Sequence, residues 1–154
     1  MSGFEDTGVD PNTSSYYYKI TAVDSCGNES AKSSYHKTIL MTTINNLPTD
    51  IGMLWDGYEG FGFSYYYIMR DSINPIVGQD STWHIIDSVT NSTFLYNDNN
   101  PPQTSNLRYR IDVKMASACL AEKTKNYNSS KSNTSYSLNN GIPMSGTTTV
   151  VDSD

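Results

Sequence analysis

The chain has 154 residues, a formal net charge of −6 and only 17% charged side chains. Contact with phosphates needs clustered positive charge, so 10 Lys and Arg against 16 Asp and Glu exclude nucleic acid as a partner. No run of 18 apolar residues occurs, which excludes membrane insertion as a helix. The 21 Ser, 16 Thr and 15 Asn residues are instead typical of an extracellular β-protein.

The first 43 residues predict only part of a domain. Residues 16–23 alternate apolar and polar side chains, which is the pattern of a half-buried strand. Residues 36–40 predict a final strand, and residues 42–47 predict a link to the next unit. Three strand pieces cannot bury both faces of a sandwich, so residues 1–43 predict the C-terminal part of a domain.

Residues 44–138 predict a complete β-sandwich. Short strands separated by turn residues are expected at 51–55, 63–70, 83–89, 93–96, 107–115 and 130–138. Such spacing is typical of two packed antiparallel sheets. No 11-residue window shows a helical period, so the expected fold class is all-β. Residues 139–154 predict a polar tail or linker.

An internal repeat relates these two parts. The predicted strand at 16–23 aligns with residues 107–114, and three alternating positions match: Tyr18 with Tyr109, Ile20 with Ile111, and Ala22 with Val113. Upstream of each strand, Phe4-Glu5-Asp6 matches Tyr96-Asn97-Asp98. Downstream, each copy reaches a Ser-rich segment, around 30–34 in the first and 129–135 in the second. A shared order of such features indicates a duplicated unit.

The residues also carry a family resemblance. Residues 6–10 (Asp-Thr-Gly-Val-Asp) followed by residues 18–30 (Tyr-Lys-Ile-Thr-Ala-Val-Asp-Ser-Cys-Gly-Asn-Glu-Ser) resemble the end of a fibronectin type III-like domain. Leu54-Trp55 resembles the second strand of the next such domain, and residues 67–70 resemble its third strand. The pattern is similar to the tandem domains of large surface proteins of gliding bacteria, which are exported by type IX secretion.

This resemblance covers residues 1 to 138 and implies a fold and a location. The implied fold is a fibronectin type III/immunoglobulin-like β-sandwich, preceded by the C-terminal strands of a second such domain. The implied location is secreted or cell-surface. Because the first domain is truncated relative to the family pattern, we expect the chain to be a fragment of a longer protein.

Nine side chains are singled out as core or contact residues. A Trp on the inner face is usual in such sandwiches, and the apolar positions of the two alternating strands are expected to point inward as well. The predicted core residues are Trp55, Tyr18, Ile20, Tyr109, Ile111 and Val113. Successive strand residues point to opposite faces, so Tyr17 and Tyr66 are expected to be exposed. With Trp83 they are candidate contacts for a glycan or a partner. Cross-strand aromatic pairing is the alternative for the two tyrosines, and a core position is the alternative for Trp83.

Three Asp-Ser pairs resemble the O-glycosylation acceptor of secreted proteins in that bacterial group. The acceptor residues are Ser72, Ser81 and Ser88. The high Ser content of the chain is the alternative explanation for these matches.

The chain offers little for catalysis or cofactors. Cys26 and Cys119 follow equivalent strands of consecutive domains, which lie far apart in a tandem, so both are predicted to be unbridged thiols. Several loop residues have calcium-ligating oxygens, but none lies in the Asp-x-Asp-x-Asp-Gly pattern: Asp6, Asp10, Asp24, Asp98 and Asn99. We expect no enzyme activity, no catalytic residue, no metal and no cofactor. Bound calcium is the alternative to the absence of a cofactor.

Two functions remain for this composition. The first is a non-catalytic extracellular module, a spacer or adhesin segment that assembles with neighbouring domains or copies of itself, including by β-strand addition. The second is a carbohydrate-binding accessory domain of a secreted hydrolase, with surface glycans as its partners. The second function requires a coplanar set of exposed aromatic rings on one sheet face.

Overall fold

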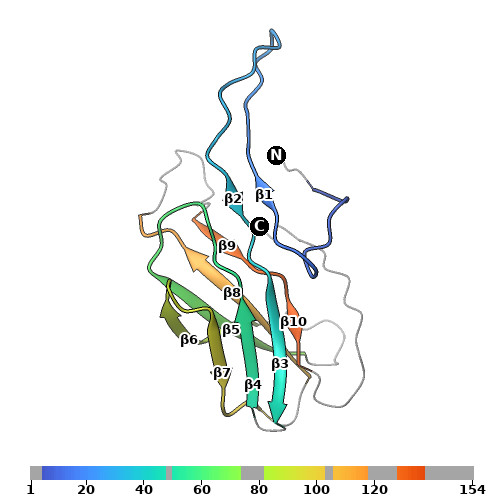
Figure 1. Cartoon of the computed structure of the whole chain (residues 1–154), viewed down its shortest axis with the longest axis vertical. Helices are drawn as coiled ribbons and strands as arrows, with labels where there is room; N and C mark the ends of the chain where they lie inside the picture. The colour runs from blue at the N-terminus through green and yellow to red at the C-terminus, as the bar shows by residue number, and fades with distance from the viewer. Residues whose placement is uncertain (1–4, 48–49, 74–81, 103–105, 118–127, 138–154) are drawn as a thin grey trace.

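The computed structural model describes residues 5–47, 50–73, 82–102, 106–117 and 128–137. These residues form antiparallel strands and contain no helix, so none of them could cross a membrane as one. Figure 1 shows two parts, a narrow N-terminal hairpin and a broader β-sandwich. The all-β prediction is confirmed for this part of the chain.

One sheet of the sandwich has three antiparallel strands in the order β3-β4-β7. The strands are β3 (Met41–Leu47), β4 (Asp50–Trp55) and β7 (Leu95–Asp98). The register between β3 and β4 shifts at Asn45 and Leu47, close to the connection between the two strands.

The second sheet has the order β10-β8-β5-β6, and β9 also pairs with β8. Its strands are β5 (Tyr65–Ile73), β6 (His84–Thr90), β8 (Asn106–Lys114), β9 (Ser129–Lys131) and β10 (Ser135–Tyr136). The two longest strands, β5 and β8, lie side by side at its centre. Consequently β5 is paired on both edges, by β6 and by β8.

Alternate residues of β8 fill the space between the two sheets. Tyr109, Ile111 and Val113 are each 0% exposed, as the sequence alternation predicts. They pack with Ile68 of β5 and with residues of the three-stranded sheet, including Trp55 at 3% exposure. Burying each such side chain stabilises the fold by about 1.5–3 kcal/mol relative to leaving it in water.

The N-terminal hairpin, residues 16–38, is here called the arm. Its two short strands, β1 (Tyr17–Tyr18) and β2 (His36–Lys37), pair antiparallel near the sandwich, and the chain beyond them projects outward (Figure 1). At the tip Gly27 has a φ of 85°, which glycine adopts without steric cost. The Asp24 carboxylate accepts the N–H groups of Cys26 and Asn28, each at 2.9 Å, and so closes the turn.

The arm departs from the predicted strand at 16–23. Within this segment, regular strand pairing is restricted to Tyr17 and Tyr18. Further along, the backbone N–H groups of Ile20 and Ala22 donate to serine hydroxyls instead of to the backbone carbonyls of a paired strand. Ile20 is 75% exposed, so its predicted place in the core is wrong, and Tyr18 is only half-buried. The reason is that no second sheet of described residues covers this hairpin.

The predicted domain boundary also needs correction. Residues 42–47 were expected to form a link, but they belong to β3, which begins at Met41. The preceding Ile39 is 2% exposed and belongs to the core, so the sandwich begins before residue 44. The predicted tail, residues 139–154, lies outside the described residues.

Candidate functional site

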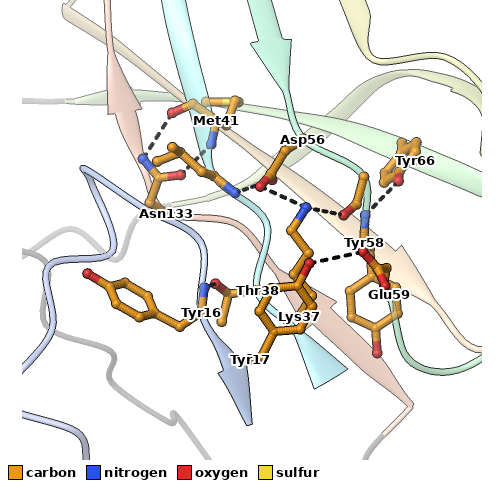
Figure 2. Close-up of polar contacts among 12 residues, drawn as sticks. Tyr16, Tyr17, Lys37, Thr38, Met41, Asp56, Tyr58, Glu59, Tyr66 and Asn133 are labelled. Carbon is orange, nitrogen blue, oxygen red and sulfur yellow. Dashed lines mark hydrogen bonds and ion pairs between the residues drawn. The ribbon is translucent and has the colours of Figure 1, made fainter. Parts of the chain in front are cut away.

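Lys37 of the arm anchors it to the sandwich. Its ammonium group forms an ion pair of 3.0 Å with Asp56 and donates to the Gly57 carbonyl oxygen at 3.0 Å. The second oxygen of Asp56 accepts the backbone N–H of Leu40 at 2.7 Å (Figure 2). Because the Lys37 side chain is only 13% exposed, water screens this pair less than a surface ion pair.

Glu59, in the loop after β4, receives two hydroxyl groups from the arm. Tyr17 donates to one carboxylate oxygen at 3.2 Å, and Tyr35 donates to the other at 3.0 Å. The hydrogen bond to Glu59 and its negative charge raise the pKa of Tyr35. The Glu59 carbonyl oxygen also accepts the Lys37 backbone N–H at 2.7 Å, so the arm and this loop are joined by backbone as well.

A chain of aromatic side chains continues from the arm into the core. His36 Nδ1 and the Tyr58 hydroxyl share a hydrogen bond of 2.7 Å. The Tyr58 backbone N–H donates to the Tyr66 hydroxyl at 2.9 Å (Figure 2). Burial raises the pKa of both tyrosines. The arm therefore contacts the sandwich through a partly buried polar network.

Asn133, two residues before β10, ties the start of β3 to the C-terminal strands. Its side-chain oxygen accepts the Met41 N–H at 2.7 Å, and its amide nitrogen donates to the Met41 carbonyl at 3.0 Å (Figure 2). A side-chain amide thus makes the pair of bonds that a neighbouring strand would make. Asn133 is 9% exposed, so its side-chain oxygen and nitrogen form these hydrogen bonds within the protein and not with bulk water.

The arm repeats the contacts that surround β8, in agreement with the sequence repeat. The Tyr18 hydroxyl donates to Asp6 at 3.3 Å, and the Tyr109 hydroxyl donates to Asp98 at 2.9 Å. In both copies the same carboxylate also accepts a backbone N–H two residues later. These are the Asp-to-Tyr positions that the sequence alignment matches.

The serine contacts repeat in the same way. The Ile20 N–H donates to Ser33 Oγ at 3.0 Å, and the Ile111 N–H donates to Ser132 Oγ at 2.8 Å. Three residues after each serine, the chain re-enters strand pairing opposite the matched tyrosine: His36 opposite Tyr18, and Ser135 opposite Tyr109. The arm is therefore a second copy of the hairpin formed by β8, β9 and β10.

Trp83 lies outside the core, on the outer face of the larger sheet. The guanidinium groups of Arg110 and Arg108 lie 4.2 Å and 5.1 Å from its ring centroid. Each arginine also pairs with a buried carboxylate, Arg108 with Asp71 at 2.6 Å and Arg110 with Asp112 at 2.8 Å. The half-buried indole is thus packed on these paired arginines rather than fully exposed to solvent.

The three predicted contact residues do not share a surface. Tyr17 is 59% exposed on the arm, and Trp83 lies on the outer sheet face. Tyr66 is 1% exposed in the core, so its prediction as an exposed contact is wrong. Alternation correctly places Tyr66 on the opposite face of the strand from Tyr65. Because Tyr66 lies opposite the buried Val113, however, its side of β5 faces the core.

The remaining site predictions are placed as follows. Cys26 is a free, exposed thiol near the arm tip, whereas Cys119 lies outside the described residues. Ser88 is exposed on β6, Ser72 has only its backbone described, in β5, and Ser81 is not described. Among the residues with described positions, no group of three His, Cys, Asp or Glu could hold a metal ion.

No family model matches this chain, and neither curated proteins nor solved structures provide a significant match. The resemblance to fibronectin type III-like domains therefore stays a prediction.

Proposed function

We propose that this chain is a non-catalytic extracellular module that serves as a rigid spacer or adhesive segment of a secreted surface protein. The observation that supports this most is the junction between the arm and the sandwich. Lys37 bonds Asp56 and Gly57, and Glu59 receives two tyrosine hydroxyls. A flexible connection between modules would have few such contacts, whereas a spacer needs a fixed angle between them.

The fold adds support for a fibronectin type III-like module. Counted along the sandwich, the larger sheet contains the third, fourth, sixth and last strands, where β9 and β10 are two pieces of the last strand, interrupted between Lys131 and Ser135. The smaller sheet contains the first, second and fifth strands. β4 and β5 occupy the second and third positions, which the resemblance assigned to Leu54-Trp55 and to residues 67–70. We propose on these grounds that the arm is the end of a preceding module of the same type.

The proposed partners are neighbouring modules or copies of the same protein, joined by β-strand addition. The alternative, a carbohydrate-binding domain, needs coplanar exposed aromatic rings on one sheet face. Because Tyr66 is buried and Trp83 packs on two guanidinium groups, that platform lacks two of its three predicted members, and Tyr17 on the arm is left without them. We therefore do not extend the proposal to glycans.

Backbone amide relaxation by NMR tests the proposed rigidity. The wild-type amides of His36, Lys37 and Thr38 should have order parameters of about 0.85, as in rigid backbone. The double substitution Lys37→Ala with Glu59→Ala removes contacts on both sides of the junction and should lower these values. Lys32→Ala, at an exposed position on the arm, is the matched control and should leave them unchanged. Wild-type order parameters below about 0.6 would contradict a rigid spacer.

A further inference from the structure

Basic residues are concentrated in one part of this acidic chain. Of the 10 Lys and Arg residues, six lie between residues 108 and 131, where only two acidic residues occur. The remaining sequence carries four basic and 14 acidic residues. An excess of four positive charges in one short segment therefore stands against an excess of ten negative charges elsewhere. Such an asymmetry of charge favours association with a partner of opposite sign.

The structure places the described basic residues of this segment on the outer face of the larger sheet. The odd-numbered residues of β8 from 107 to 113 are each 0% exposed in the core. Because alternate residues of a strand point to opposite faces, the even-numbered ones point outward: Arg108, Arg110, Asp112 and Lys114. Lys131 of β9 lies opposite Asp112 and so shares this outer face.

Asp112 is surrounded by three of these cations. Its two carboxylate oxygens accept Nε and Nη2 of Arg110 at 2.8 Å and 3.2 Å. Burial raises the pKa of Asp112, whereas the charges of Arg110, Lys131 and Lys114 act in the opposite direction, so all three lie near it. One carboxylate, 7% exposed, balances only one of the three cations. The surface above Asp112 therefore keeps two positive charges in excess.

The two lysines of this cluster are open to solvent. Lys114 and Lys131 are exposed, and neither forms an ion pair with a described residue, whereas Arg108 is balanced by Asp71 at 2.6 Å. The Lys114 ammonium group lies 5.0 Å from the ring centroid of Tyr67, which restricts where that side chain points. A cation that is already oriented loses less conformational freedom when it binds a ligand.

The three cations follow β8 in even steps. Arg110 and Lys114 lie two residues before and two residues after Asp112, and Lys131 stands beside Asp112 itself. Two residues of a strand span about 7 Å, which is also the spacing of alternate side chains in an extended peptide. A peptide with an acidic residue at every second position would place one carboxylate beside each cation.

The aromatic rings on this face favour a peptide over a sugar. A sugar ring stacks on an aromatic ring that is open to solvent. Here Tyr67 already stacks with Lys114, and Trp83 stacks with Arg110 at 4.2 Å. Recognition on this face therefore depends on charge, and carboxylates form strong charge-assisted hydrogen bonds with Lys and Arg.

We propose that the outer face of β8 and β9 binds an extended acidic segment of a partner protein, with alternate Asp or Glu side chains paired to Arg110, Lys131 and Lys114. This inference goes beyond the proposed function, because a spacer needs no ligand on this face. It depends on the charge of the face and on the register of β8 with β9, and not on the arm.

A labelled peptide, Glu-Ser-Glu-Ser-Glu-Ser-Glu, is the probe, added to the full chain. Fluorescence anisotropy at an ionic strength of about 0.01 M should show saturable binding with a Kd below about 1 mM. Raising the ionic strength to about 0.15 M should weaken binding, because salt screens exposed charges. The same peptide with Gln in place of Glu should not bind. Glu-Glu-Glu-Glu-Ser-Ser-Ser has the same composition without the alternation and should bind at least about threefold more weakly.

A matched pair of variants tests the position of the site. Lys114→Gln with Lys131→Gln should weaken binding at least about tenfold. The control, Lys19→Gln with Lys32→Gln, removes the same charge from exposed positions on the arm and should change the Kd less than about twofold. In the wild-type chain, the peptide should shift the backbone amide NMR signals of Lys114 and Lys131 more than those of the arm, which needs no variant to fold.

Four results would overturn the inference. They are an absence of binding at about 1 mM peptide, equal weakening by the two double variants, equal binding of the alternating and the contiguous peptide, and tighter binding of polygalacturonate that the two sheet lysines control. The last result would assign the face to an acidic polysaccharide. None of them depends on the order parameters at the junction, so this inference and the proposed function fail independently.

Discussion

The hydroxyl group of Tyr109 donates a 2.9 Å hydrogen bond to the carboxylate of Asp98 inside the sandwich. Arg70 of β5 pairs with the same carboxylate oxygen at 2.6 Å, so β5, β7 and β8 meet at one buried acid. Burial, and then Asp98, raise the pKa of Tyr109 well above its ordinary value. The stability linked to this hydroxyl is therefore fully present below the unfolded pKa and is lost as pH rises through the folded pKa.

Tyr109→Phe should lower the free energy of unfolding by about 1–3 kcal/mol, because it removes one of the two partners of Asp98 Oδ2 inside the sandwich. The matched control is Tyr18→Phe, where the equivalent bond to Asp6 is longer, at 3.3 Å, and only partly buried. That control should change stability by no more than about 0.5 kcal/mol. Urea denaturation at neutral pH measures both values, and equal losses would contradict the difference in burial between the two copies.

Gly60→Ala should disrupt the contact between His36 and Tyr58. A Cβ atom at this position would collide with the Tyr58 ring and lie 2.5 Å from His36 Nδ1, so both side chains would have to move. We expect a loss of about 1–3 kcal/mol in unfolding free energy, as for other overpacked sites. Gly62→Ala is the control, because an added Cβ there meets open space. If both variants unfold at the same urea concentration, the close approach at Gly60 is not important for stability.

The Asp112 carboxyl group should make the free energy of unfolding depend on pH, at pH values above the pKa that this group has in the unfolded chain. Burial raises the pKa of this carboxyl group, against the opposing effect of Arg110. A raised folded pKa means that the native state binds the proton more tightly, so wild type loses stability as pH rises between the unfolded and folded values. Asp112→Asn should therefore gain stability relative to wild type as the pH increases from about 3 to about 7.

Urea unfolding at several pH values across this interval tests that expectation. Asp87→Asn, at an exposed carboxylate on β6, is the control and should show no comparable relative gain. A constant difference between Asp112→Asn and wild type would contradict the assignment.

Removing Arg110 should expose the indole ring of Trp83. Its guanidinium group lies 4.2 Å from the ring centroid, closer than that of Arg108 at 5.1 Å. Arg110→Met should increase quenching of tryptophan fluorescence by acrylamide, because it removes the closer of the two cations packed on the ring. Arg108→Met should have the smaller effect on quenching. Because Trp55 is 3% exposed, the quenchable signal reports mainly on Trp83.

Local sequence patterns by themselves determined much of this fold. The alternation at residues 107–113 predicts β8 and its inward residues, because a strand with one buried face must repeat every two residues. The matched order of Asp, Tyr, Ile and Ser in two places predicts the duplication of the hairpin. The structure then shows equivalent bonds in both copies, at Tyr18 and Tyr109.

Other features were decided only by the tertiary structure. Alternation separates Tyr66 from its neighbours, but which face of β5 is inward depends on its register with β8. Ile20 carries the same local pattern as Ile111, yet it is exposed because no second sheet of described residues covers the arm. The junction formed by Lys37, Asp56 and Glu59 has no periodic signal, since its partners come from separate segments that only folding brings together. Burial and pairing depend on neighbours distant in sequence, and a local pattern carries no information about them.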